Sequence, residues 1–236
     1  SVIIHANPHR IEFLRSFGII SDIKKHIYIR NFPDQSFIDS KLTPPSYTNI
    51  QEWLDGKNYV YLQGISDSSR YPFNSVASIL RSTDLKVVVT ALMDENVKNE
   101  LLSEFCSQLD QRVYFTGMLN QMHTPCLIRG ALFSIVLYNQ KTPNARLCEA
   151  NRFYQSLVFG VPVIAGSNVP MKEIIDKHKC GIAMQSDGAD IDELIMSVSK
   201  LVNNYPAYKE NAEAIKDQFV WDDQSVYNKL SNFFLA

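Results

Sequence analysis

The sequence predicts a doubly wound α/β domain with a mostly parallel sheet and a helical C-terminal tail, and three observations support this fold class. Short apolar runs alternate with helix-like segments from residue 59 to residue 184. The runs are continuously apolar rather than alternating, as expected of parallel strands covered by helices on both faces. From residue 190 onward only helix-like patterns remain. A chain of 236 residues is long enough for one such domain with part of another.

The composition excludes several classes of function. Hydrophobic residues make up 45% of the chain and charged residues 20%, as in ordinary globular proteins. The formal net charge of −2 offers no general attraction for nucleic acid, so we expect no such partner. The cysteines lack paired spacing and the histidines are scattered, so we expect no metal site. No apolar run approaches the roughly 18 residues that span a bilayer, and we expect no signal peptide before the first strand.

The first 57 residues are expected to lead into the sheet domain rather than form part of it. Residues 1–6 have the pattern of a strand and residues 8–17 that of a helix. Because the chain opens directly on a strand, we expect a piece of a longer protein. A second short strand is expected at 27–33. Residues 34–49 contain Pro44-Pro45 and many Ser, Asp and Thr residues, so we expect a loop or linker there, extending to residue 57.

The domain proper is expected to follow in regular alternation. We predict strands at 59–63, 86–91, 112–115, 132–138, 162–165 and 181–184. Helices are predicted between them at 72–81, 96–109, 124–129, 150–159 and 171–179. Helix 96–109 carries Leu101, Leu102, Phe105 and Leu109 on one side, the spacing of a surface helix packed on a sheet.

The C-terminal tail is predicted to be entirely helical. Its first helix carries one apolar stripe, formed by Ile191, Leu194, Ile195, Val198 and Leu201. Pro206 is placed to begin a second helix, and Trp221-Asp222-Asp223 precedes a third. We therefore divide the chain into residues 1–33, 34–57, 58–205 and 206–236.

The segment from Asn151 to Gly166 is the most informative part of the sequence. It has the pattern of a short helix, a glycine stop at Gly160 and a short apolar strand that follows Pro162. The start of a helix presents unpaired backbone N–H groups and about half a positive charge, which suits a phosphate. Asn151 and Arg152 at this start can add donors to the same anion.

Four motifs, in chain order, carry a resemblance to a known family. They are Tyr61-Leu62-Gln63-Gly64 followed by Arg70, Val113-Tyr114-Phe115-Thr116-Gly117, the segment 151–166, and Glu173-Ile174-Ile175 leading to Gly181-Ile182-Ala183. Together they resemble the C-terminal, nucleotide-sugar-binding half of GT-B glycosyltransferases of the family-four type. The third motif is similar to that family's N-K-x-x-E … G-x-P-V-I-A pattern, and Trp221 before a final helix also fits the family.

The resemblance implies a set of site residues. It assigns Arg70 and Arg152 to the diphosphate, where fixed cations stabilise the departing charge without a metal ion. The alternative is that both are surface arginines in solvated ion pairs. The resemblance implies that donor-nucleotide contacts come from Gly64, Thr116, Gly117, Asn151 and Gln155.

Two positions depart from the family pattern. Gln155 stands where the family has a glutamate that binds the ribose hydroxyls, and an amide offers one acceptor and one donor group instead of a carboxylate. Leu147 occupies the position of a second glutamate that touches the donor sugar, so Glu149 is the nearest carboxylate. Glu149 is a candidate catalytic residue, or it favours the helix start through the helix dipole. The loop 139–146 either lines the sugar pocket or is an ordinary exposed loop.

The resemblance implies the donor-binding half of a hexosyltransferase that takes a UDP- or GDP-sugar, with no cofactor, and a glycan or lipid-linked acceptor. It implies that residues 1–33 are a remnant of the acceptor domain with a linker strand. Without that missing half, we expect this chain to bind nucleotide but to transfer no sugar. We expect it in the cytoplasm or at the inner face of the membrane. The alternatives are a sugar-nucleotide epimerase of the same architecture, and a catalytically degenerate module that binds a nucleotide or a partner protein.

Overall fold

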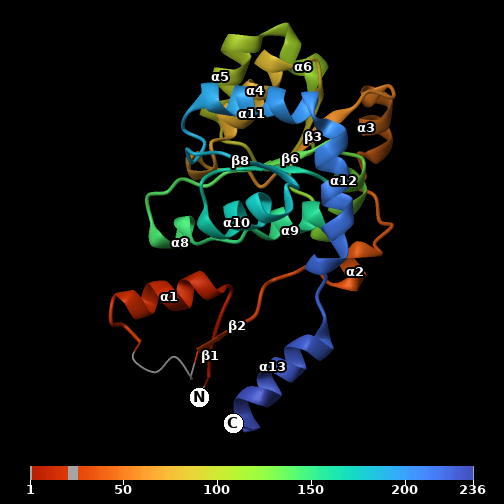
Figure 1. The fold of residues 1–236 in the computed structure, drawn as a ribbon. Coiled ribbons are helices and arrows are strands. Elements are labelled where there is room, and N and C mark those ends of the chain that lie inside the picture. Colours follow the sequence, from red (N-terminus) through yellow and green to blue (C-terminus); the bar gives the residue numbers. More distant parts are fainter. Residues whose placement is uncertain (1, 21–25, 236) are drawn as a thin grey trace.

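The computed structural model describes residues 2–20 and 26–235, and its centre is a parallel sheet (Figure 1). Within these residues the sheet has six strands in the order β5-β4-β3-β6-β7-β8. The strands are β3 (Tyr59–Gln63), β4 (Lys86–Thr90), β5 (Val113–Phe115), β6 (Ser134–Val136), β7 (Val163–Ala165) and β8 (Gly181–Ala183). All six predicted strands are confirmed, several of them shorter than expected, and the doubly wound α/β fold is confirmed with them.

The strands are mostly apolar because both faces of the sheet are buried. Along β3, Val60 and Leu62 face one hydrophobic cluster, while Tyr59 and Tyr61 face another. This is the alternation of side chains that a strand imposes. On the first face the cluster includes helices α4 (Pro72–Ser82), α5 (Glu95–Phe105) and α11 (Ile191–Asn203). On the other face the clusters include α7 (Thr124–Arg129), α9 (Asn151–Leu157) and α10 (Val169–His178).

The helix predicted at 96–109 is broken into two. Helix α5 ends at Phe105, and α6 (Ser107–Arg112) begins after Cys106, whose φ of 40° lies outside the helical region. Both Phe105 and Leu109 are buried in the same cluster. The chain therefore buries an apolar residue against the sheet on each side of the break.

The segment 34–57 is not the loop that its composition predicts. It contains α2 (Gln35–Ile38) and α3 (Tyr47–Leu54), and Phe37, Ile50 and Leu54 are buried against the sheet domain. Asp34 caps α2 by accepting a hydrogen bond from the Phe37 N–H at 2.8 Å. The polar and proline residues mark the turns around these helices. The apolar residues spaced between them decide where the helices pack.

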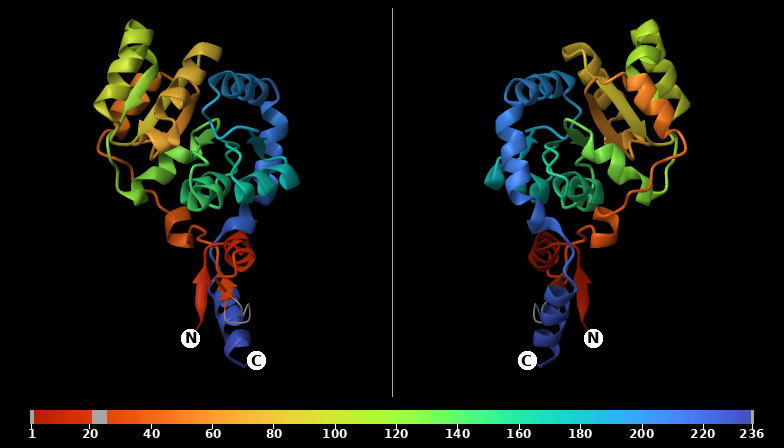
Figure 2. Two further views of the ribbon diagram at one scale, coloured as in Figure 1. Left: turned by 90° about the vertical axis from the view of Figure 1, so that its left-hand side faces the viewer. Right: turned by 90° about the vertical axis from the view of Figure 1, so that its right-hand side faces the viewer.

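The two ends of the described chain lie below the sheet domain, beside each other (Figure 2). Strands β1 (Ile3–His5) and β2 (His26–Tyr28) form a separate parallel pair, joined to helix α1 (Pro8–Ser16). The strand predicted at 27–33 is thus shorter and starts one residue earlier, and the part of the first predicted strand at Ser1 lies outside the described residues. The expected helical tail is confirmed as α12 (Tyr205–Ile215), a 3-10 turn η4 (Lys216–Phe219) and α13 (Asp223–Leu235). Within the described residues, the structure has no helix with the length and hydropathy of a membrane span.

Candidate functional site

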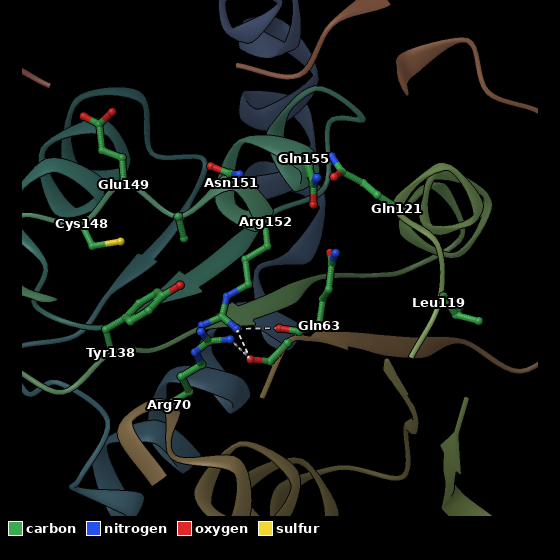
Figure 3. A pocket seen from close by; sticks show the side chains of 12 residues that line it. Gln63, Arg70, Leu119, Gln121, Tyr138, Cys148, Glu149, Asn151, Arg152 and Gln155 are labelled. Carbon is green, nitrogen blue, oxygen red and sulfur yellow. Dashed lines mark hydrogen bonds between the residues drawn. The ribbon is translucent and has the colours of Figure 1, made fainter. Parts of the chain in front are cut away.

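The order of the strands reverses direction at one point of the sheet, between the neighbouring strands β3 and β6. From β3 the chain moves outward through β4 and β5, then returns to the other side of β3 and moves outward through β6, β7 and β8. In doubly wound sheets, ligands bind beyond the carboxyl ends of the strands at such a point. A cavity of about 400 Å³ opens there. It is lined by Gln63, Gly64, Arg70, Leu119, Gln121, Tyr138, Cys148, Glu149, Ala150, Asn151, Arg152 and Gln155 (Figure 3).

The turn after β3 brings the first arginine into this cavity. Gly64 has a φ of +64°, which lets the chain turn sharply at the strand end. A Cβ atom on Gly64 would lie 3.2 Å from Arg70 Nη1 and 3.3 Å from Arg152 Nη1. Arg70 lies at the end of the 3-10 turn η2 (Ser68–Arg70), where its Nη1 donates to the Gly64 carbonyl and its Nε lies 3.4 Å from Asp67 Oδ2. A glycine is therefore needed where the two guanidinium groups approach the backbone.

Arg152 occupies the floor of the cavity and binds the ends of two strands. Its Nη1 donates to the Gln63 carbonyl at 2.6 Å and to the Gly64 carbonyl at 3.0 Å, and its Nη2 donates to the Leu137 carbonyl at 3.0 Å. The residue is only 8% exposed. Burial lowers the pKa of Arg152, and the Arg70 guanidinium beside it lowers it further. Arginine nevertheless remains protonated, so this floor carries a fixed positive charge.

The two arginines concentrate positive charge at one wall. Both guanidinium groups lie over the Tyr138 ring, Arg70 at 5.5 Å and Arg152 at 4.8 Å from its centroid. Both also donate to the same Gly64 carbonyl (Figure 3). Among the residues that the structure describes, Asp67 is the one carboxylate that forms an ion pair with either of them. Since the charges are only partly compensated, this wall attracts an anion.

The other side of the cavity presents neutral amides. Gln155 is 3% exposed, and within residues 2–20 and 26–235 its Oε1 has no hydrogen-bond partner. Gln121, Gln63 and Asn151 add further carboxamide groups. Amides can both donate and accept, so they suit the hydroxyl and carbonyl groups of a nucleoside without adding charge.

Glu149 is buried and paired with a residue from the N-terminal part of the chain. Its side chain is 2% exposed, and its Oε1 lies 2.9 Å from Arg30 Nη1. In Figure 3 its carboxylate points away from Arg70 and Arg152. Burial raises the pKa of Glu149, and the Arg30 guanidinium offsets part of that rise.

A second cavity of about 370 Å³ adjoins the first and shares Tyr138 and Cys148 with it. Its remaining lining comes from Ser69 and from the loop after β6, with Asn139, Lys141, Thr142, Asn144 and Ala145. The loop is anchored by the Asn139 N–H on the Ser69 carbonyl at 2.7 Å, and part of it forms the short helix α8 (Pro143–Arg146). The predicted loop 139–146 therefore lines a cavity, and it is more structured than its composition indicates.

Comparison with solved structures identifies the fold. Anabaena HepE in complex with UDP superposes with a TM-score of 0.72 at 15% identity, covering 98% of this chain and 64% of HepE. Sucrose-phosphate synthase from Thermosynechococcus elongatus gives a TM-score of 0.70 at 13% identity, covering 99% of this chain and 57% of the synthase. WaaG, a glycosyltransferase involved in lipopolysaccharide biosynthesis, gives a TM-score of 0.65 at 16% identity, covering 91% of this chain and 58% of WaaG.

The chain has the Rossmann-like fold of a GT-B glycosyltransferase domain. It spans about three fifths of the length of these three proteins. No protein-family model matches the sequence, and no curated protein matches it. The likeness to GT-B structures is therefore a likeness of fold.

Within this GT-B domain, most of the predicted site residues come together. The cavity is lined by Gly64, Arg70, Glu149, Asn151, Arg152 and Gln155. Thr116 and Gly117 lie outside its lining, and the Thr116 hydroxyl instead lies 3.0 Å from the Thr90 hydroxyl. The roles of all eight residues stay predictions.

Sequence reasoning missed several lining residues. Leu119 and Gln121 follow the predicted Thr116-Gly117 pair by a few positions and form that side of the cavity. Their position depends on a 3-10 turn, η3 (Gln121–His123), that no sequence pattern indicated. Tyr138 is the last residue of the predicted strand 132–138. Since ligands bind beyond the carboxyl ends of such strands, this position could have identified Tyr138 as a lining residue.

Proposed function

We propose that this chain is the donor-binding part of a metal-independent glycosyltransferase that binds a nucleoside diphosphate sugar. The observation that carries the proposal is the cavity at the switch point of the sheet, where Arg70 and Arg152 form a cationic wall opposite neutral amides. The structures of HepE with UDP and with UDP-glucose support the assignment of the ligand class. The substrate would be a UDP- or GDP-sugar, from which a hexosyl group passes to a glycan or lipid-linked acceptor.

The chemistry of the transfer explains why cations line this wall. When the bond to the sugar breaks, negative charge grows on the diphosphate that leaves. A fixed positive charge in a partly buried site stabilises that charge and needs no reorganisation during the step. Arg70 would contact the diphosphate directly. Arg152, with its guanidinium engaged by strand-end carbonyls, would contribute its charge and hold the turn that carries Arg70.

The two adjoining cavities suit the two parts of the ligand. The first has amides for a nucleoside and arginines for phosphate. The second has Ser69, Asn139, Thr142 and Asn144, whose hydroxyl and amide groups suit a sugar, together with the Tyr138 ring. Since both share Tyr138 and Cys148, one ligand would extend through them with its diphosphate near Arg70.

A degenerate binding module is the alternative that a specific observation favours. Gln155 and Leu147 replace the two carboxylates of the family pattern, and Glu149 is engaged by Arg30. A domain that retains the phosphate wall without these carboxylates would bind a nucleotide and perform no transfer. In either case we expect the isolated chain to transfer no sugar, because acceptor contacts belong to the part of a GT-B enzyme that this chain lacks.

The proposed function is tested by titrating the chain with UDP, GDP, ADP and CMP in a calorimeter. We expect a nucleoside diphosphate to bind, CMP to bind weakly, and binding to persist in the presence of EDTA. Absence of binding by all four nucleotides would reject the proposal. Binding of a nucleotide sugar together with turnover by the isolated chain would overturn the expectation that this chain is inactive alone.

Arg70 is the sharpest single test of the phosphate wall. Replacing it by methionine should weaken binding of the nucleoside diphosphate by at least about tenfold, the usual effect of losing one hydrogen bond to a charged group. The matched control is Arg81→Met, because Arg81 lies near the C-terminal end of α4, pairs with Glu104 at 2.6 Å and does not line the cavity. Equal affinity of Arg70→Met and the wild type would remove Arg70 from the site.

A further inference from the structure

The segment 147–151, which leads into α9, has two sides. One side contributes Cys148, Glu149, Ala150 and Asn151 to the lining of the first cavity. The other side is held by residues that precede the sheet domain in the chain. The same few residues therefore connect the cavity with the N-terminal part of the protein.

Three contacts hold this segment at alternate residues. The buried Asn7 Nδ2 donates to the Leu147 carbonyl at 2.8 Å. Arg30 Nη1 lies 2.9 Å from Glu149 Oε1, and Asn31 Nδ2 donates to Asn151 Oδ1 at 2.8 Å. The segment is thus attached along its length to positions more than a hundred residues earlier.

The Arg30 contact differs from the other two because it pairs charges, a half-buried guanidinium with a buried carboxylate. Arg30 Nη1 also donates to the Tyr154 hydroxyl at 2.8 Å, and Tyr154 is fully buried. Burial alone would lower the pKa of Arg30, but Tyr154 and Glu149 raise it above its ordinary value. In the described part of the chain no other cation forms an ion pair with Glu149. Removing one partner of such a pair leaves a buried charge uncompensated, which is costly.

We propose that Arg30 is a positioning residue for the nucleotide site: by neutralising Glu149 it holds the segment 147–151 against the cavity. The inference rests on the proposed function, since it concerns the same site. Binding free energies are reciprocal between coupled sites. A ligand that binds only when the segment 147–151 lies against the cavity therefore also favours docking of the N-terminal part of the chain onto the sheet domain.

The first experiment is a double-mutant cycle. Arg30→Met should weaken nucleoside diphosphate binding by about tenfold, the size of coupling within one charged network. Adding Glu149→Gln to Arg30→Met removes the uncompensated charge and should recover most of the lost affinity, and Arg30→Lys should retain most of it. Arg81→Met is the control for loss of a paired arginine elsewhere. Equal affinity in Arg30→Met and the wild type, or no recovery in the double variant, would overturn the proposal.

The pH profile separates positioning from a general loss of structure. The groups that face Glu149 are Arg30 from the segment after β2, Tyr154 from α9, and His9 and Arg10 from α1. Without Arg30 the pKa of Glu149 should rise further. The affinity of Arg30→Met should then improve as the pH falls from about 8.5 to about 6, because protonation removes the uncompensated charge. The double variant retains His9 and Arg10 but has no carboxylate at position 149. Its pH profile therefore records the titration of the ligand and of these other groups, and it serves as the reference. Parallel profiles for the two variants would contradict a role through Glu149.

A readout without nucleotide distinguishes the two proposals. Cys148 lies next to Glu149 and lines both cavities, and burial raises the pKa of its thiol. If Arg30 holds the segment, alkylation of Cys148 followed by peptide mass mapping should be several times faster in Arg30→Met than in the wild type, with recovery in the double variant. Such a change in a chain that binds no nucleotide would reject the proposed function but keep the positioning role. An unchanged alkylation rate would reject the positioning role.

Discussion

Replacing Arg152 by methionine is expected to abolish nucleotide binding and to lower the free energy of unfolding by about 3 kcal/mol. The three hydrogen bonds of Arg152 satisfy carbonyls at the carboxyl ends of β3 and β6, where the cavity begins. Without them the Gln63 and Leu137 carbonyls each lose a charged donor, the Gly64 carbonyl keeps only Arg70, and the turn that carries Arg70 loses its support. Calorimetric titration with UDP measures the loss of binding, and chemical denaturation followed by circular dichroism measures the loss of stability.

Arg112 offers a matched control for the structural part of this prediction. Its guanidinium also donates to three backbone carbonyls, those of Leu80, Thr83 and Leu85, but it lies outside the cavity. Arg112→Met should therefore destabilise the fold by a similar amount and leave the affinity of the folded protein unchanged. If folded Arg152→Met binds UDP as tightly as folded Arg112→Met, Arg152 has no part in the site.

Replacing Gly181 by alanine is expected to lower the free energy of unfolding by about 3 kcal/mol or more. Gly181 opens β8 and is paired with Val163 of β7. A Cβ atom there would lie 2.0 Å from the Val163 carbonyl oxygen, and that atom belongs to the backbone of a buried strand. The clash can be relieved only by separating two hydrogen-bonded strands, and thermal unfolding would record the loss as a lower Tm.

Gly117→Ala is the control for the Gly181 prediction. Gly117 has a φ of +72°, and a Cβ atom there would meet nothing within 4 Å. The cost should be limited to backbone strain of about 1 kcal/mol. Equal destabilisation by the two substitutions would mean that the contact with Val163 is not the cause.

The positions of the strands could be predicted because they depend on local composition. The central strands are buried on both faces, so their residues are mostly apolar, and this pattern is visible in the sequence alone. The glycine after β3 and the proline before β7 marked strand boundaries for the same reason, since backbone preferences act within a few residues.

The elements that escaped prediction depend on packing. Helix α3 lies in a segment whose prolines and small polar residues indicated a loop, yet Ile50 and Leu54 find an apolar surface on the sheet domain. The break at Cys106 likewise falls between two residues, Phe105 and Leu109, that are buried in one cluster. Such outcomes depend on surfaces that form only when distant parts of the chain meet.

The sequence by itself determined the doubly wound fold, the glycine at the end of β3, and six of the residues that gather at the switch point. Only the tertiary structure decided how those residues are used. Arg152 turns its guanidinium to strand-end carbonyls, and Glu149 pairs with Arg30 rather than facing the arginines of the cavity. The physical reason is that a buried charge takes the partner that compensates it, and that partner can come from any part of the chain. Local patterns place a residue on an element, whereas burial and pairing across the fold decide what its side chain does.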